Sequence, residues 1–367
     1  MPLFICCFEL SQYYDVVIIA LGGGLQCLSV LSHMKIQLAH TYDDIISVNN
    51  LLCAWEEFVV DKSSKPDVII FAGKLMDNIF SLREDLVNRT YQHGTYQSFF
   101  INDPKRRHIH KANVRDRLLH HAVYRALYPF FDRTFIANSF SCRNDKGMHR
   151  ALNRFREFAY QVSRNHTRTC WVLKCDIKQF FASVDQGILM QILVRYIPDV
   201  DILNLLTNIL DSFHTKNQQH VGLPLGNLTS QLFTNIYMNE FDQWVKHKLK
   251  ATYYIRYADD FVFLSEDRDW LGSIIPHVRQ FLADRLNLTL HPNKIFLKTV
   301  ASGVDFLGWV HFFDHRVLRT ATKRRMFRRI RDHPTDETVQ SYIGLLRHGN
   351  AAQLREQVLI QQWLWQS

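Results

Sequence analysis

Residues 253–264 read Tyr-Tyr-Ile-Arg-Tyr-Ala-Asp-Asp-Phe-Val-Phe-Leu, and this stretch decides the fold. Two apolar runs, 253–257 and 261–264, flank the paired carboxylates Asp259 and Asp260. Aromatic and β-branched residues favour strands, so the pattern predicts a hairpin with the acids at its tip. An ordinary turn also accepts Asp, but a turn in solvent has no need of apolar residues pressed to both sides of the acidic pair.

A third carboxylate has similar surroundings. Asp176 follows the apolar run 171–175, and the chain then turns toward Phe180 and Phe181. Adjacent carboxylates repel one another and burial raises their pKa values, so a divalent cation between them would relieve both penalties. Two strand ends of this kind can hold a pair of Mg²⁺ ions about 3.5–4 Å apart, which activates an attacking hydroxyl and neutralises leaving phosphate oxygens. The pattern therefore indicates nucleotide addition.

Composition fits a protein of two or three subdomains. The 367 residues are 47% hydrophobic and 22% charged, which excludes low-complexity disorder. Lys and Arg number 44 against 35 Asp and Glu, and the net charge of +9 suits a polyanionic partner. The seven cysteines form no C-x-x-C pair, which indicates reduced thiols in a cytosolic protein and no zinc site. We expect a cytoplasmic protein with no membrane partner.

Residues 1–33 differ from the rest because they contain no Lys or Arg. Their apolar stretch, 16–31, is shorter than the roughly 20 residues that span a bilayer. Glu9 and Asp15 precede it, where a signal peptide needs positive charge. We expect translation to begin at Met34 and residues 1–33 to be a non-native or disordered extension; a membrane tether is the alternative.

The remaining pattern predicts a mixed α+β body followed by helices. Helical periodicity covers 35–88, and runs 96–101 and 107–109 predict a hairpin with a basic tip. Further helices are expected at 115–128 (stopped by Pro129), 183–196, 202–213, 229–249 and, with breaks at Pro334 and 349–350, 320–365.

Two segments resemble motifs of reverse transcriptases. The A motif is matched by Asp176 with Phe180-Phe181, and the C motif is matched by Tyr257-Ala258-Asp259-Asp260. The resemblance covers residues 102–309 in the family's motif order. It implies an RNA-directed DNA polymerase that copies an RNA template from a DNA or RNA primer with dNTPs and two Mg²⁺ ions, or Mn²⁺ as a substitute. The implied fold is the α+β right hand, with N-terminal helices and fingers at 34–168, palm at 169–310 and helical thumb at 311–367.

The same resemblance assigns the catalytic centre. The expected metal ligands are Asp176, Ile177, Asp259 and Asp260, and the three acids are also the catalytic carboxylates. Lys294 matches the lysine that protonates the leaving pyrophosphate, although a solvated surface lysine is an alternative.

Other motifs resemble the sites of the family that hold the incoming nucleotide. The residues concerned are Phe181, Arg143, Lys146, Lys105, Gly226 and Gln231. Phe181 matches the steric gate, whose ring clashes with a 2′-hydroxyl and so selects deoxynucleotides; a core phenylalanine is the alternative. Arg offers phosphate a bidentate fork and Lys a point charge.

A third set is expected to contact template or primer. Its members are Arg115, Arg117, Leu307, Gly308, Lys323, Arg324, Arg325 and Arg328. Residues 304–309 resemble the primer grip, and the cations behind them have no acid among them until Asp332, which favours a nucleic-acid backbone. Two alternatives remain. Arg115 and Arg117 could form salt bridges within the protein, and the four cations at 323–328 could form a solvated helix face.

One segment distinguishes between classes of reverse transcriptase. It is residues 222–231, which read Gly-Leu-Pro-Leu-Gly-Asn-Leu-Thr-Ser-Gln. Leu225 and Gln231 depart from the usual bacterial pattern and resemble the enzymes of diversity-generating retroelements. Those enzymes make frequent errors opposite adenine and usually work with a small basic helical accessory protein. The resemblance implies a bacterial or phage-encoded enzyme of this kind.

Several alternatives remain open. A defence-associated or other uncharacterised bacterial reverse transcriptase, and a group II intron-like enzyme, share many of these motifs. Only some 58 residues follow Trp309, too few for a thumb plus a nuclease domain. A viral-type RNA polymerase would carry Gly before the paired acids. An inactive nucleic-acid-binding scaffold would be expected to lack one metal-binding acid, and all three are present.

Overall fold

The structure is a computed structural model that describes residues 6–7, 17–21, 24–26, 36–102, 106–215 and 218–366. The expected extension 1–33 and the start at Met34 lie outside this range, apart from three short strands, β1 (Cys6–Cys7), β2 (Val17–Leu21) and β3 (Gly24–Gln26). None of the helices in the described part of the chain has the length and apolar character needed to span a bilayer.

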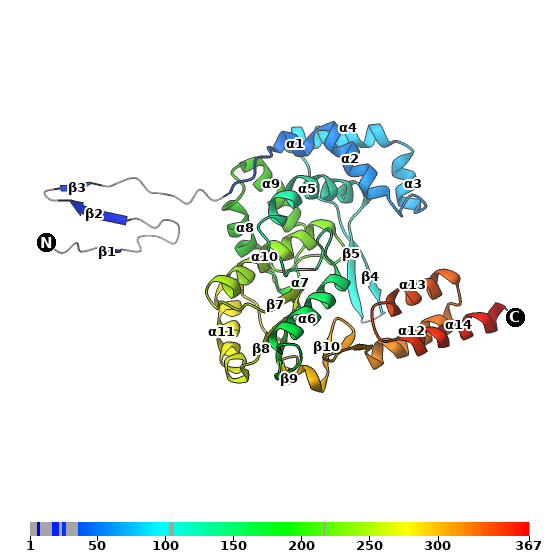
Figure 1. The fold of residues 1–367 in the computed structure, drawn as a ribbon. Helices are drawn as coiled ribbons and strands as arrows, with labels where there is room; N and C mark the ends of the chain where they lie inside the picture. The colour runs from blue at the N-terminus through cyan, green and yellow to red at the C-terminus, as the bar shows by residue number, and fades with distance from the viewer. Residues whose placement is uncertain are drawn as a thin grey trace.

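A four-stranded antiparallel sheet forms the centre of the molecule (Figure 1). Its order is β7-β8-β6-β9, and its strands are β6 (Trp171–Asp176), β7 (Tyr254–Tyr257), β8 (Asp260–Ser265) and β9 (Phe296–Thr299). The predicted hairpin around the acidic pair is confirmed as β7–β8. In the register of β6 and β8, Asp176 lies opposite Asp260.

Each face of this sheet is covered by a separate set of helices because strand side chains alternate between faces. Leu173, Phe261 and Phe263 pack in one core with the helices α10 (Leu228–His247) and α11 (Arg268–Leu286). Val172 and Val262 pack in a second core with α6 (Met148–Val162). By the same alternation Asp176 and Asp260 share the α6 face, so the acids lie on that side of the sheet.

Five helices and a β-hairpin of the described residues lie before the sheet in the chain, between β3 and α6. The helices are α1 (Tyr42–Ile46), α2 (Val48–Val59), α3 (Pro66–Ala72), α4 (Leu75–Val87) and α5 (Val114–Asp132), and the hairpin pairs β4 (Gln97–Ile101) with β5 (Arg107–Lys111). The predicted stop at Pro129 is wrong, since α5 continues to Asp132. Proline costs a helix about 3 kcal/mol, and burial of Phe130 and Phe131 in the core offsets that cost.

The other helices follow the predicted pattern with shifted ends. Residues 180–211 form α7 (Phe180–Ser183), α8 (Gln186–Val194) and α9 (Val200–Asp211). After a small sheet of β10 (Val304–Phe306), β11 (Trp309–His311) and β12 (Arg316–Leu318), the tail forms α12 (Thr320–Asp332), α13 (Asp336–Leu346) and α14 (Ala352–Gln366). The predicted breaks at Pro334 and 349–350 are confirmed.

A fully buried ion pair joins the sheet to α10. Arg256 of β7 and Asp242 of α10 are both 0% exposed, with Nη2 of the arginine 2.7 Å from Oδ2 of the aspartate. Tyr254 Oη donates to the same carboxylate at 2.8 Å, and Arg256 Nη2 donates to Ser139 Oγ at 3.0 Å. This network fixes the strand that leads directly into Ala258 and Asp259.

Candidate active site

The three acids meet at one end of the sheet. Tyr257 pairs with Asp260, so only Ala258 and Asp259 form the turn of the β7–β8 hairpin. Ala258 adopts the left-handed region with φ of 54°, as two-residue hairpins require. Since Asp176 is the cross-strand neighbour of Asp260, the fold brings the carboxylates of two separate motifs to the same sheet end.

Burial and mutual repulsion act on these acids together. Burial, followed by the charges of Asp260 and Asp176, raises the pKa of Asp259 to about 6. Burial also raises the pKa of Asp260, against the opposing effect of Lys174. Asp260 Oδ1 is buried and accepts no hydrogen bond. The acidic end of the sheet is therefore short of positive charge and of hydrogen-bond donors.

The donor set fits a hard divalent cation, because carboxylate oxygens are the ligands that Mg²⁺ and Mn²⁺ prefer. Among the described residues, no group of three or more His, Cys, Asp or Glu side chains is placed so that it could hold a metal ion, and this includes Asp176, Asp259 and Asp260. Instead Lys294 Nζ donates to both oxygens of Asp176, at 2.9 and 3.0 Å. A cation bound to Asp176 would compete with this ammonium. Ile177 is buried and forms a bridge with Leu290.

Sequence analysis missed Lys174, which lies two residues before Asp176 on the same face of β6. Its Nζ is 3.6 Å from Asp260 Oδ1 and donates to the backbone carbonyl of Asp305 at 3.0 Å. It thus links the acids to the β10–β11 hairpin, whose turn is Leu307-Gly308. A lysine inside an otherwise apolar strand was the signal that could have identified it.

The loop before α10 packs on the segment that carries Phe181. Leu223 donates its backbone N–H to the Phe181 carbonyl at 2.7 Å. Gly226 has φ of 110° and lies so close to β5 that an added Cβ would be 2.9 Å from Ile109 Cγ2. Phe181 and Gln231 are both half-buried. Glycine at 226 therefore meets both a backbone and a steric requirement.

The β4–β5 hairpin docks on this loop through contacts that sequence analysis missed. His110 donates its N–H to the Leu225 carbonyl at 2.9 Å, and Asn227 Nδ2 donates to the His110 carbonyl at 3.0 Å. Both contacts span more than 110 residues of sequence, so no local pattern could have predicted them. They hold Leu225, one of the distinguishing residues, against the hairpin.

Arg143 and Lys146, two of the residues predicted to contact the triphosphate, instead form hydrogen bonds within the protein. The Arg143 side chain is only 5% exposed, with Nε 2.7 Å from Asp132 Oδ1. It also donates to the carbonyls of Ile136 and Ser139. Lys146 Nζ donates to the Ala137 carbonyl at 2.9 Å. Lys105 lies outside the described residues.

The predicted template contacts divide into paired and exposed cations. Arg115 forms an ion pair with Asp85, and Arg117 lies 2.5 Å from Asp67. These are the internal salt bridges of the alternative interpretation, with partners on α3 and α4. On α12, the side chains of Lys323, Arg324 and Arg328 are exposed and that of Arg325 is half-buried. Leu307 and Gly308 form the tight turn of β10–β11, with φ of 50° and 83°.

The chain is similar to several known proteins. Residues 102–311 match the family model for the reverse transcriptase (RNA-dependent DNA polymerase). Protein YkfC of Escherichia coli (strain K12) is 26% identical over 281 residues, covering 66% of this chain and 71% of YkfC. The group II intron-encoded protein LtrA of Lactococcus lactis subsp. cremoris is 22% identical, covering 68% and 51%. The retron Ec83 reverse transcriptase of Escherichia coli is 32% identical, covering 39% and 48%. The chain spans about half the length of the last two.

Proposed function

The chain belongs to the reverse transcriptase family, and from that premise we propose that it is an RNA-directed DNA polymerase. The observation that carries the proposal is the register of β6 and β8, which sets Asp176 opposite Asp260 with Asp259 in the adjoining turn. Its substrates are an RNA template, a DNA or RNA primer, and dNTPs. Residues 34–168 serve as N-terminal helices and fingers, 169–310 as palm and 311–367 as thumb.

The proposed chemistry uses Asp176, Asp259 and Asp260, with the backbone of Ile177, to hold two Mg²⁺ ions. Bound ions of this kind activate a primer hydroxyl and neutralise charge on the leaving pyrophosphate. The chain itself supplies the remaining functions. Lys294, which contacts Asp176, is suitably placed to leave that carboxylate and give a proton to the departing pyrophosphate.

Primer extension tests this proposal. Purified protein with poly(rA), oligo(dT), dTTP and Mg²⁺ should extend the primer. The Asp259→Ala variant should not, whereas a matched control, Asp284→Ala on the exposed face of α11, should keep full activity. Absence of extension by folded wild-type protein, with a candidate accessory protein supplied, would favour the scaffold interpretation instead.

Phe181→Ala should weaken the discrimination against ribonucleotides. We propose that the ring lies beneath the sugar of the incoming nucleotide, where a 2′-hydroxyl would clash. Its removal should lower the ratio of kcat/KM for dTTP to that for UTP about 10–100-fold. Phe180→Ala, which truncates a neighbouring ring buried in the core, is the control. A folded Phe181 variant with an unchanged ratio would indicate that the side chain only fills the core.

We further propose that the enzyme serves a diversity-generating retroelement, in the cytoplasm of a bacterium or an infected host, together with a small basic helical protein. Leu225 and Gln231 support this, because Leu225 is held against the β5 strand beside the proposed nascent base pair.

Leu225→Gln should therefore lower misincorporation opposite adenine. Glutamine restores the polar residue that other bacterial relatives carry before the glycine, and we expect the error rate at adenines to fall about tenfold while errors at other bases change little. Sequencing of cDNA made on a mixed template measures both rates. Leu359→Gln, on the exposed face of α14, is the control. Equal error rates in all three proteins would contradict the retroelement assignment.

A further inference from the structure

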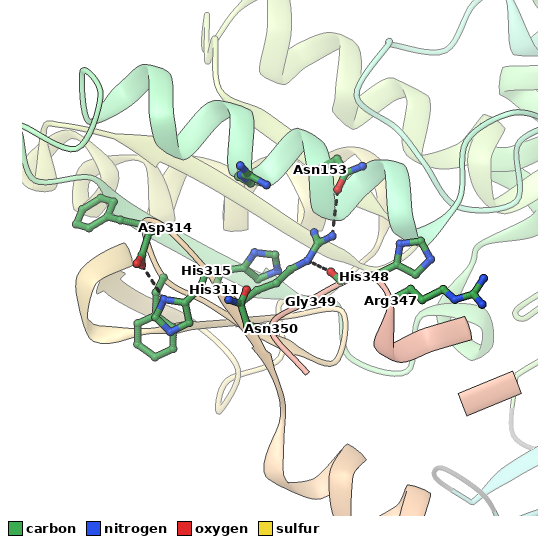
Figure 2. Close-up of a pocket in the computed structure, with 12 residues that line it drawn as sticks. Asn153, His311, Asp314, His315, Arg347, His348, Gly349 and Asn350 are labelled. Atoms are coloured by element: carbon green, nitrogen blue, oxygen red, sulfur yellow. Dashed lines mark hydrogen bonds and ion pairs between the residues drawn. The ribbon is translucent and has the colours of Figure 1, made fainter. Parts of the chain in front are cut away.

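A cavity of about 320 Å³ is lined by α6 of the proposed fingers region and by residues 311–316 and 347–350 of the proposed thumb (Figure 2). Asp176, Asp259 and Asp260 are not among its lining residues. Three distant segments form its walls: α6, the β11–β12 turn, and the connection between α13 and α14. Of the lining residues, Gly349 and Asn350 belong to a feature predicted from the sequence, the break in the C-terminal helices.

The lining is cationic without matching carboxylates. Arg156, Arg316 and Arg347 line the cavity, and its one acid, Asp314, is bonded to the neighbouring His315 at 2.7 Å. An adjoining cavity shares Arg156 and Asp314 and adds Glu157, which pairs with Arg154 at 2.9 Å. None of the acids that line the two cavities forms an ion pair with the three arginines.

Arg316 has a hydrogen-bond donor for which the described part of the chain offers no acceptor. Its Nε donates to the His348 carbonyl, and its Nη2 donates to Asn153 Oδ1 at 3.1 Å. Its Nη1 is buried and has no hydrogen-bond partner. Burial and the charge of Arg156 lower the pKa of Arg316, which means that the guanidinium is desolvated beside a like charge. A buried donor without an acceptor costs roughly 1–3 kcal/mol, and a bound anion would remove that cost.

The cavity walls are already fixed in position. Asn350 donates its backbone N–H to the Arg316 carbonyl at 2.9 Å. Gly349 lies flat on Trp309, where an added Cβ would come within 2.1 Å of Cζ3. The rings of His149 and His348 stack with their centroids 3.4 Å apart, which joins α6 to the thumb connection. A ligand would therefore meet a preorganised site rather than a surface that must close around it.

We propose that this cavity is a second phosphate-binding site, which holds a backbone phosphodiester of the nucleic acid away from the catalytic acids. Two observations favour nucleic acid over a free anion. The cavity belongs to the same face of the sheet as Asp176, and β12 leads directly from Arg316 into the exposed cations of α12. The identity of the ligand rests on the proposed function; the anion-binding chemistry does not.

Binding of a duplex without catalysis tests the site. Arg156 and Arg347 are exposed, so the double variant Arg156→Gln/Arg347→Gln should fold normally. Its affinity for a 20-base-pair RNA–DNA duplex, measured by fluorescence anisotropy with Ca²⁺ and no dNTP, should fall on the order of tenfold at 0.15 M salt. The slope of log affinity against log salt should shrink by about 0.9, the value for one phosphate contact. Arg279→Gln/Arg285→Gln, on α11 across the sheet, is the matched control and should change neither quantity.

Inorganic phosphate separates the two sources of the ligand. The thermal midpoint of the wild type should rise with added phosphate, and that of the double variant should not. If phosphate stabilises the wild type but both proteins bind the duplex with the same slope, the site takes a free anion and the nucleic-acid proposal is overturned. If neither probe distinguishes the proteins, the site itself is refuted. If the wild type fails to extend a primer but its salt slope for duplex binding still exceeds that of the double variant, the polymerase proposal is overturned and the phosphate-site proposal stands.

Discussion

Replacing Asp259 with Asn should abolish primer extension and, without divalent cations, should make the protein more stable. Burial and the charges of Asp260 and Asp176 raise the pKa of Asp259 to about 6, from an ordinary value of 3.8. At pH 7.5 the folded protein therefore holds an ionised carboxylate that it disfavours. A shift of this size corresponds to about 3 kcal/mol at most, and we expect a gain of about 1–2 kcal/mol in the free energy of unfolding.

The pH dependence has a definite sign. Well below pH 3.8 the Asp259 carboxyl is protonated in both the folded and the unfolded chain, so the penalty is absent. Between pH 3.8 and about 6 the unfolded chain is ionised while the folded chain still holds the proton, so the wild type loses stability relative to the Asn variant as the pH rises through this interval. The stability difference between the two proteins should thus grow from pH 4 to pH 6 and then remain constant.

Thermal unfolding in EDTA and in Mg²⁺ measures this effect. Mg²⁺ should stabilise the wild type and leave the variant nearly unchanged, because the variant lacks one anionic ligand. The variant's rate of extension should fall at least 10³-fold, since a metal-bound centre supplies several kcal/mol of barrier reduction. Asp284→Asn is the control for both measurements. Equal stabilisation of wild type and Asp259→Asn by Mg²⁺ would contradict the assignment of Asp259 as a ligand.

The meeting of the three acids at one end of the sheet could be predicted because their signal is local. An apolar run that ends in a carboxylate specifies a strand and its end, as at Asp176, and the tight turn at Ala258 follows from the two runs around it. Antiparallel pairing then left few ways to arrange these segments. The helices α6 and α11 and the strand β9 were not predicted. In α6 the signal was present and was missed, because apolar residues recur at helical spacing, namely Ala151, Leu152, Phe155, Phe158, Ala159 and Val162. In β9 only four residues form the strand, and pairing with β6 rather than an apolar pattern defines it.

The partners of charged residues could not be predicted, since those contacts join segments far apart in the chain. Arg117 pairs with Asp67 across 50 residues, and Arg143 turns inward to Asp132 although its motif indicates a phosphate contact. A sequence pattern gives the type of a side chain but not the direction in which burial and neighbouring carboxylates turn it. The lysine at 174 stands out in an apolar strand, but its contact with the Asp305 carbonyl, 131 residues away, could not be predicted for the same reason.

Replacing Arg256 with Met should destabilise the protein by about 3–5 kcal/mol. The substitution leaves Asp242 charged and 0% exposed, with only Tyr254 Oη still donating to it. The guanidinium also donates to the carbonyl of Ala258 at 3.3 Å, so its loss should loosen the turn that carries Asp259. Urea unfolding followed by circular dichroism measures the loss of stability, and Arg285→Met, an exposed arginine at the end of α11, should change it by less than about 0.5 kcal/mol.

A second substitution distinguishes the cost of an unpaired charge from the loss of packing. Arg256→Met/Asp242→Leu removes both charges, and a buried pair replaced by apolar side chains of similar size is often neutral in stability. The double variant should therefore recover most of the 3–5 kcal/mol, whereas primer extension should stay low because nothing then holds the Ala258 carbonyl. Recovery of extension together with stability would show that Arg256 acts only through the fold. A single variant that loses less than about 1 kcal/mol would mean that water or another donor reaches Asp242.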